Sequence, residues 1–218
     1  YRFLQETVPA DVRDFDWIWL RLPYPVPEGF FDFLRREVGE ERIFNRPSGI
    51  EETGSKAFLT QFPEWCPDVQ LCHTYEEVEA MQRRYPIVLK PLRSYGGQGI
   101  LKIKHNKVYE TSGPVPLIRY TEQLQQGFDQ GGYLGMRYLK NVRKGDKRVI
   151  VANGEILGAV LRMPARGSWL CNASQGGRAK LSKADAREQA MARDLSEVLL
   201  PKGIAMFGMD TLVNDDGQ

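Results

Sequence analysis

The segment from Val88 to Ile100 constrains the fold more than any other part of the chain. A short apolar run ends there at Lys90, and a second apolar run begins at Ile100. Short apolar runs bounded by turn residues predict buried strands, here over residues 87–90 and 100–103. The chain must therefore bring two strands together around a turn.

Three glycines lie in this turn: Gly96, Gly97 and Gly99. Because glycine has no Cβ, the backbone N–H groups of such a turn can approach a bound anion closely. Lys90, at the end of the first strand, can direct its ammonium to the same place. The turn differs from a Walker A loop, since no Gly-Lys-Ser/Thr opens a following helix. Phosphate binding and a plain glycine hairpin with a solvated lysine both fit these residues.

The composition indicates an ordinary globular protein. The chain has 218 residues, 42% of them hydrophobic, which is enough for one large domain or two small ones. No apolar run reaches the length of about 18 residues that a membrane span needs. Thirty basic and 28 acidic residues are interspersed along the chain, whereas a nucleic-acid-binding protein usually concentrates its charge on one face. We therefore expect neither a nucleic-acid partner nor a membrane partner.

The cysteines and histidines indicate a cytoplasmic protein without a histidine-rich metal site. Cys66, Cys72 and Cys171 are odd in number and show no metal-like pairing, so we expect reduced thiols. His73 and His105 are too few for a histidine cluster. The chain begins at Tyr1 rather than Met, from which we expect a piece of a longer gene product.

In the first half of the chain, strands and helices alternate. We expect strands over residues 16–22, 42–44, 87–90 and 100–103, and helices after Pro27, over residues 55–62, and from Thr74 to just before Pro86. Thr74 and Glu77 have the spacing of a capping box. The opening strand–helix–strand pattern resembles the end of a preceding α/β unit.

Beyond about residue 130 the chain becomes rich in strands. We expect strands over residues 133–139, 148–152, 156–161 and 206–213, and a helix over residues 183–199. Asn153-Gly154 is a hairpin signal between two of these strands. Asp216-Gly217 is a second such signal, so we expect a further strand after Gln218.

Three more segments bear chemically suggestive side chains. Arg148 opens an apolar strand after the charged turn Lys144–Lys147, where its guanidinium can grip an oxyanion bidentately, although a solvated turn fits equally. Small and polar residues follow Arg162, which indicates either a mobile lid or a surface loop. Asp210 lies in an apolar strand, which predicts a metal ligand, a cap or an ion pair. No nucleophile motif is present.

Taken in order, these motifs resemble the ATP-grasp superfamily and, most closely, prokaryotic-type glutathione synthetases. The resemblance covers nearly the whole chain. It rests on these matches: Lys56-Ala57-Phe58, Leu89-Lys90-Pro91-Leu92, Tyr138-Leu139, Gly145-Asp146-Lys147-Arg148, Leu161-Arg162-Met163-Pro164, Asn172, Gly176-Gly177-Arg178 and Gly208-Met209-Asp210. The Gly-Asp-Lys-Arg turn followed at this distance by Gly-Gly-Arg is the most specific of them.

The resemblance implies an α/β (α+β) class and the ATP-grasp fold, in which two α+β subdomains grip ATP. Residues 1–50 would be the end of a pre-ATP-grasp α/β domain. Residues 51–218 would be the ATP-grasp domain, with an N-terminal subdomain over 51–132 and a truncated C-terminal subdomain over 133–218.

The resemblance also implies roles for individual residues. Arg148, Arg162 and Arg178 would be catalytic, binding the transferred phosphate or the substrate carboxylate, and Asp210 would hold the metal. Asn172, Gly176 and Gly177 would form the substrate-covering lid. The nucleotide would be bound by the following residues: Lys56, Lys90, Gly96, Gly97, Gly99, Met136, Arg137, Tyr138, Leu139 and Asp146.

The implied activity is ATP-dependent amide formation through an acyl phosphate, with Mg²⁺ (or Mn²⁺) as the cation. For a glutathione synthetase the carboxylate is that of γ-glutamylcysteine and the amine is glycine, so the partners would be small molecules; a homo-oligomer is an open option. Alternatives are another amino-acid or peptide ligase of the superfamily, or a non-catalytic nucleotide-binding relative.

Two departures from the family pattern stand out. The Glu-x-Asn metal ligands that follow the Asp210 strand in the family are absent before Gln218, and we expect them on the further strand. The loop from Arg166 to Cys171 contains the bulky Trp169 and no acidic residue, which leaves the exact substrate undetermined.

Overall fold

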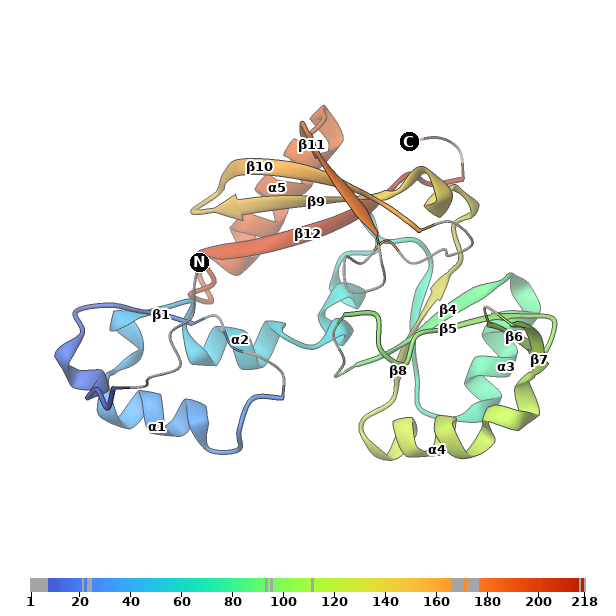
Figure 1. Ribbon diagram of the computed structural model, residues 1–218, viewed down its shortest axis with the longest axis horizontal. Helices are drawn as coiled ribbons and strands as arrows, with labels where there is room; N and C mark the ends of the chain where they lie inside the picture. Colours follow the sequence, from blue (N-terminus) through green and yellow to red (C-terminus); the bar gives the residue numbers. More distant parts are fainter. Residues whose placement is uncertain are drawn as a thin grey trace.

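A computed structural model describes residues 8–20, 22, 25–92, 94, 96–110, 112–165, 171, 177–215 and 217. Three groups of elements are distinguishable in it: an N-terminal unit and two lobes that each combine a sheet with helices (Figure 1). Within the described residues, no helix is both long enough and apolar enough to cross a bilayer.

The N-terminal unit is a small strand–helix–strand arrangement. After a 3₁₀ turn, η1 (Val12–Asp14), it contains β1 (Ile18–Trp19), α1 (Phe30–Glu37), a second turn, η2 (Glu40–Arg42), and β2 (Ile43–Phe44). The two strands are parallel, and α1 packs its apolar side against them through Leu34 and Val38. The strand predicted over residues 16–22 forms only at β1 among its described residues.

A helix that the sequence analysis missed follows this unit. α2 (Pro47–Thr53) begins at Pro47, three residues after the strand β2 ends. Proline is favoured in the first helical turn, because its missing N–H would have no intrahelical partner there. Pro47 therefore starts an element here and does not only end one.

The first lobe is a six-stranded antiparallel sheet in the order β3-β8-β4-β5-β6-β7. Its core is formed by apolar side chains of the sheet and of two helices, among them Val78, Met81, Leu89 and Leu124. Both helices lie on one side of the sheet (Figure 1). The bounds are β3 (Val69–Cys72), α3 (Tyr75–Arg84), β4 (Ile87–Pro91), β5 (Leu101–Lys104), β6 (Lys107–Glu110), β7 (Gly113–Pro116), η4 (Leu117–Tyr120), α4 (Thr121–Asp129) and β8 (Tyr133–Arg137).

Two helix predictions in this lobe had different outcomes. The capping box is confirmed: the Thr74 hydroxyl accepts from the Glu77 N–H at 3.3 Å, and the Glu77 carboxylate accepts from the Thr74 N–H at 3.2 Å. The helix predicted over residues 55–62 is wrong in type, since the segment forms the 3₁₀ helix η3 (Lys56–Gln61). Pro63 lies two residues after its end and has no N–H with which to continue a helical ladder, so the segment stays short.

The second lobe is a four-stranded antiparallel sheet in the order β11-β10-β9-β12, with α5 packed against one side (Figure 1). Asn153 and Gly154 connect β9 to β10 with φ of 49° and 83°, which confirms the predicted hairpin. The bounds are η5 (Lys140–Lys144), β9 (Asp146–Ala152), β10 (Glu155–Met163), β11 (Arg178–Ser182), α5 (Ala186–Leu199) and β12 (Met206–Leu212). β11 was not predicted, and part of the second hairpin signal, Asp216, lies outside the described residues.

Candidate functional site

Alternation along β9 separates the side chains of the second lobe into two sets. Val149 and Val151 point toward α5 and are fully buried, whereas Asp146 and Arg148 point to the opposite side. Pairing places Arg162 of β10 opposite Asp146, and Asp210 of β12 opposite Arg148. We call the surface formed by Asp146, Arg148, Arg162 and Asp210 the open face.

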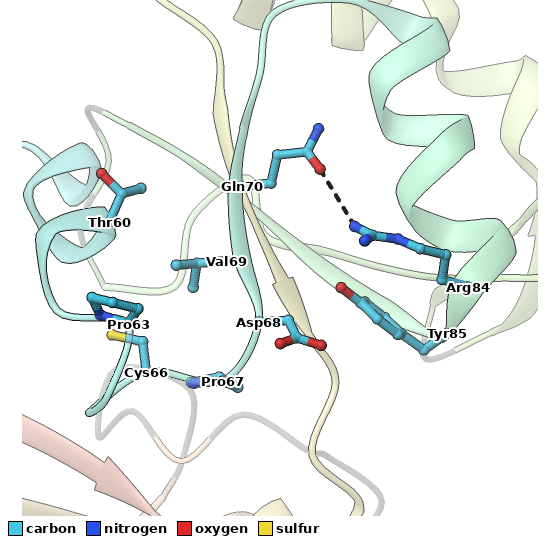
Figure 2. Close-up of a pocket in the computed structure, with 9 residues that line it drawn as sticks. All are labelled: Thr60, Pro63, Cys66, Pro67, Asp68, Val69, Gln70, Arg84 and Tyr85. Atoms are coloured by element: carbon cyan, nitrogen blue, oxygen red, sulfur yellow. Dashed lines mark hydrogen bonds between the residues drawn. The ribbon is translucent and has the colours of Figure 1, made fainter.

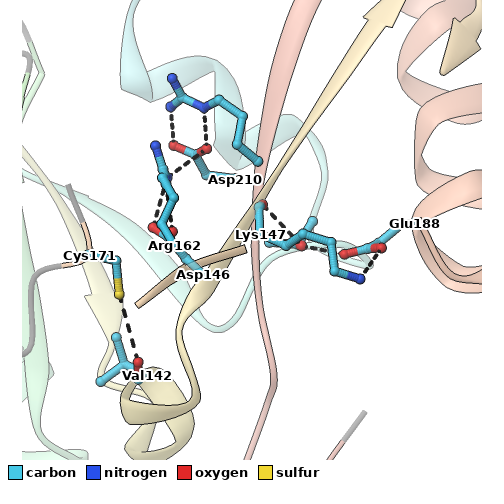
Figure 3. Close-up of polar contacts among 9 residues, drawn as sticks. Val142, Asp146, Lys147, Arg162, Cys171, Glu188 and Asp210 are labelled. Carbon is cyan, nitrogen blue, oxygen red and sulfur yellow. Dashed lines mark hydrogen bonds and ion pairs between the residues drawn. The ribbon is translucent and has the colours of Figure 1, made fainter. Parts of the chain in front are cut away.

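Four charged side chains of the open face form a continuous network (Figure 3). Arg148 donates to Asp210 with Nε and Nη2 at 2.7 and 2.5 Å, a bidentate pair. Arg162 donates to Asp146 in the same manner at 2.7 and 2.8 Å, and its Nη2 lies 2.9 Å from Asp210 Oδ1. Asp210 therefore joins the two arginines.

The network shifts the pKa values of Asp210 and Arg162. Burial would raise the pKa of Asp210, but hydrogen bonds and charge from Arg148 and Arg162 outweigh it and hold that pKa below its usual value. Burial opposes the charged form of Arg162, yet Asp146 and Asp210 raise its pKa. Asp210 and Arg162 are therefore both ionised near neutral pH.

The end of β4 brings Lys90 close to the open face. Burial lowers the pKa of Lys90, and the negative charges of Asp210 and Asp146 partly offset that shift. A lysine from the first lobe thus lies within electrostatic reach of carboxylates from the second. The two lobes meet here around a cluster of cationic groups.

Lys56 lies at the base of the glycine turn. Its ammonium donates to the carbonyl of Pro91 at 2.7 Å and to the carbonyl of Ser94. Burial, aided by the charge of Lys90, lowers the pKa of Lys56 to about 8. Lys56 and Lys90, 34 positions apart in sequence, therefore lie within electrostatic reach of each other, and their joint role in binding a nucleotide stays a prediction.

The three glycines of the turn all have positive φ. The values are 64° at Gly96, 82° at Gly97 and 68° at Gly99. A Cβ at Gly99 would also lie 3.0 Å from Cγ of Pro91. Any other residue would strain this backbone, so the turn needs its glycines for conformational reasons.

Residues Met136 to Leu139 connect the two lobes. Met136 pairs with Val88 across β8 and β4, and the Tyr138 N–H donates to the carbonyl of Pro86 at 2.8 Å. The Lys102 ammonium lies 3.6 Å from the centre of the Tyr138 ring, a cation–π contact that no sequence signal indicated. The predicted nucleotide-binding segment thus adjoins β4, which ends at the lysine site.

The remaining predicted residues are not brought into the network. Arg178 is exposed at the start of β11, opposite Met163, and Gly177 precedes it. Asn172 and Gly176 lie outside the described residues. A joint role of Arg178 with Arg148 and Arg162 stays a prediction.

A divalent cation does not fit these residues as they are arranged. Within the described part of the chain, no three His, Cys, Asp or Glu side chains lie close enough together to hold a metal ion. Both oxygens of Asp210 accept hydrogen bonds from arginines. Two guanidinium groups beside one carboxylate also repel a further cation.

A cavity of about 390 Å³ lies beside β3 in the first lobe (Figure 2). Arg84 donates to Gln70 at 3.4 Å on one side of the strand, and Pro63, Cys66 and Pro67 lie on the other side. The cavity shares no residue with the open face.

Three polar contacts to α5 had no signal in the sequence. Lys147 donates to Glu188 of α5 at 2.6 Å, and the Thr211 hydroxyl donates to the same carboxylate at 2.6 Å (Figure 3). Trp65, which follows η3, donates to Asp194 of α5 at 3.0 Å. Lys147 belongs to the charged turn noted in the sequence, but its partner Glu188 lies 41 residues away and has no local sequence signal.

Comparisons with known proteins agree with this architecture. Residues 55–215 match the family model described as the prokaryotic glutathione synthetase ATP-grasp domain. The glutathione synthetase of Brucella melitensis is 30% identical over 213 residues, which are 96% of this chain and 66% of that protein. The chain thus spans slightly less than two thirds of that relative.

Two solved structures share the fold at low sequence identity. D-cycloserine synthetase DcsG has a TM-score of 0.63 and 12% identity, over 87% of this chain and 67% of that one. D-alanine–D-alanine ligase from Bacillus anthracis, complexed with ATP, has a TM-score of 0.59 and 13% identity, over 93% and 65%. With an ATP-grasp fold and a family match over most of its length, the chain belongs to the prokaryotic glutathione synthetase family and contains that family's ATP-grasp domain.

Proposed function

We propose that this protein is an ATP-dependent carboxylate–amine ligase, and specifically a glutathione synthetase that joins γ-glutamylcysteine and glycine. The observation that supports it best is the meeting of Lys56 and Lys90 from one lobe with the arginine–aspartate network of the other. Such a cluster suits a triphosphate and a carboxylate, which must be brought together against their mutual repulsion.

The proposed division of the chain follows the two sheets except at β8, which pairs within the first sheet but begins the second subdomain. Residues 1–50 belong to the end of a pre-ATP-grasp α/β domain. Residues 51–132 form the first subdomain and 133–218 the second, with β8 leading from one to the other. ATP would bind between them, with its base near Met136 to Leu139 and its phosphates near Lys90 and the glycine turn.

The first chemical step is transfer of the γ-phosphoryl group. A carboxylate oxygen of the dipeptide attacks the γ-phosphorus, the bond to the β,γ-bridging oxygen breaks, and an acyl phosphate and ADP result. Arg148 and Arg162 would stabilise charge on the transferred group, while Lys56 and Lys90 would hold the nucleotide phosphates. The protein's work is positioning and electrostatic stabilisation, not covalent catalysis.

The second step forms the amide. The amine of glycine attacks the acyl carbon, inorganic phosphate leaves, and the nitrogen loses a proton. Arg178, Asn172, Gly176 and Gly177 are proposed to cover the substrates at this stage, which would keep water from the acyl phosphate.

ATP-grasp membership implies ATP as a substrate and use of a divalent cation, and we propose Mg²⁺, with Mn²⁺ as a substitute. The cation would neutralise phosphate charge when bound. Asp210 stays a predicted ligand only, because the described residues do not fit the ion as arranged. We further propose a cytoplasmic protein with small-molecule substrates.

The test is phosphate release by the purified protein expressed from its complete gene, with ATP and Mg²⁺. γ-Glutamylcysteine and glycine are supplied separately and together, and Lys90→Ala is compared with Lys107→Ala, an exposed lysine on β6. Release that requires both substrates, is lost in Lys90→Ala and persists in Lys107→Ala is the expected result. ATP binding without such release would retain the nucleotide site and reject these substrates.

A further inference from the structure

The Arg148 guanidinium already holds an oxyanion, and that oxyanion is the protein's own. Its Nε and Nη2 both donate to Asp210, one hydrogen bond to each carboxylate oxygen. This fork-to-fork geometry is the one in which arginine binds the carboxylate or phosphate of a ligand. Asp210 therefore occupies the position that a ligand oxyanion would take on Arg148.

The two arginines of the open face differ in how firmly they are held. Arg162 and Asp146 expose only 12% and 16% of their side chains, and their bidentate pair lies inside the protein. Arg148 and Asp210 expose 45% and 42%. Exposed ion pairs contribute little to stability, because water and salt compete for both partners. We call Arg162–Asp146 the inner pair and Arg148–Asp210 the outer pair. The inner pair is held in place by burial, whereas Arg148 of the outer pair can exchange Asp210 for another oxyanion.

Asp210 also contacts the fixed arginine through Arg162 Nη2, at 2.9 Å. If Asp210 leaves the Arg148 fork, its carboxylate keeps this partner. Arg148, in contrast, gains a free pair of donors that point away from the sheet's core. Separating Arg148 from Asp210 therefore leaves neither charge buried without a partner, so the free-energy cost of the exchange is small.

We propose that Asp210 is an internal counter-ion that occupies the oxyanion-binding fork of Arg148 and yields it to a phosphate or carboxylate group of the ligand. The inference rests on the proposed nucleotide site. It makes Asp210 a competitor of the ligand for the guanidinium of Arg148, so the ligand must displace a carboxylate of the protein to bind there.

The test measures ATP affinity in EDTA, without any divalent cation, by titration calorimetry on the full chain. Asp210→Asn keeps the shape of the side chain and removes its charge. Glu155→Gln is the matched control, because it removes one negative charge from an exposed position on β10. The Asp210 variant should bind ATP about three- to fivefold more tightly than the wild type, as expected for loss of a half-exposed ion pair, and the control should bind as the wild type does.

A double-mutant cycle identifies the residue through which Asp210 acts. In an Arg148→Gln background, the gain from Asp210→Asn should disappear, since the fork it vacates no longer exists. A wild-type-like thermal unfolding transition for each variant establishes that the affinities refer to folded protein.

Three results would overturn the inference. Equal or weaker cation-free binding by Asp210→Asn would show that Asp210 does not compete with the ligand. An equal gain in Glu155→Gln would reduce the effect to overall charge. Persistence of the gain without Arg148 would assign it to another group. Failure of every variant to bind ATP, with or without Mg²⁺, is a distinct outcome that would reject the proposed nucleotide site as well.

Discussion

The two sides of the second-lobe sheet contain polar clusters of similar composition in different surroundings. On the side covered by α5, Lys147, Thr211 and Glu188 hydrogen-bond one another, with Glu188 only 7% exposed. On the open face, Arg148 and Asp210 form an equally short ion pair that is nearly half exposed. Neighbouring residues of β9, Lys147 and Arg148, supply the cation of each cluster. The hydrogen-bond geometry of the two clusters is therefore similar, and burial is what distinguishes them. A buried group that loses its partner stays unsolvated, whereas an exposed group is solvated by water.

Replacing Arg148 with alanine should produce the largest effect, and it should fall on activity. In the proposed mechanism its guanidinium stabilises the transferred phosphoryl group, and its loss is then expected to lower kcat by about 10²–10³-fold, or about 3–4 kcal/mol. The free energy of unfolding should change by less than about 0.5 kcal/mol, since the lost ion pair is solvent-exposed. Steady-state phosphate release and urea unfolding measure the two quantities. A large loss of stability with normal kcat would reverse the comparison.

Replacing Glu188 with alanine should produce the opposite pattern. The substitution leaves the Lys147 ammonium and the Thr211 hydroxyl without their buried partner and removes one half of the α5 capping box. We expect a loss of about 2–3 kcal/mol in the free energy of unfolding, somewhat below the value for a fully buried pair because Lys147 is 18% exposed. Urea unfolding measures it.

The matched control for that experiment is Glu197→Ala, an exposed glutamate on the same helix. It should change the free energy of unfolding by less than about 0.5 kcal/mol. If the Glu188 and Glu197 variants were equally stable, burial would not be what distinguishes the covered cluster.

The elements that the sequence predicted well are those with local signals. The Thr74 capping box, the Asn153-Gly154 hairpin and the strand pair around the glycine turn each follow from a few adjacent residues. β3 was missed because this edge strand pairs with β8, far away in sequence. β11 was missed although it pairs with the preceding strand, because its residues Arg178–Ser182 are mostly polar and show no apolar alternation. β6, β7 and α4 were not predicted either. α2 was missed because Pro47 can either end or begin a helix.

The same distinction applies to the candidate site. Arg148, Arg162 and Asp210 could be named from motifs, since each lies in a recognisable segment. Which carboxylate each arginine contacts depends on strand register, and a shift of one residue would direct them to the other side of the sheet. From the residues alone, Asp210 could be a metal ligand, a cap or a member of an ion pair, and the register shows ion pairs with two arginines. Glu188 had no motif and was not identified.

An intermediate case lies between the two clusters. Arg162 is 12% exposed, so its bidentate pair with Asp146 resembles the covered cluster, yet it belongs to the open face. Arg162→Lys keeps the charge but cannot reproduce the bidentate geometry. We expect a loss of about 1–2 kcal/mol in the free energy of unfolding together with a reduced kcat, measured by urea unfolding and phosphate release. A change in the free energy of unfolding alone would make Arg162 a structural residue, and a change in kcat alone would make it a functional one.

The smallest expected effect is a pH dependence that arises from Asp210. Its pKa is lower in the folded protein than in the unfolded chain, so the unfolded chain binds the proton more readily. The pair with Arg148 and Arg162 therefore stabilises the fold fully above the ordinary Asp pKa of about 3.9, and this contribution is lost as the pH falls through the lower folded-state value. With a side chain 42% exposed, the contribution should stay below about 1 kcal/mol. Urea unfolding of the wild type and of Asp210→Asn, followed from pH 5 downward, should give free energies that converge as the pH falls. Curves that stay parallel across this range would mean that the outer pair adds nothing to stability, which would widen the contrast between the open and covered sides of the sheet.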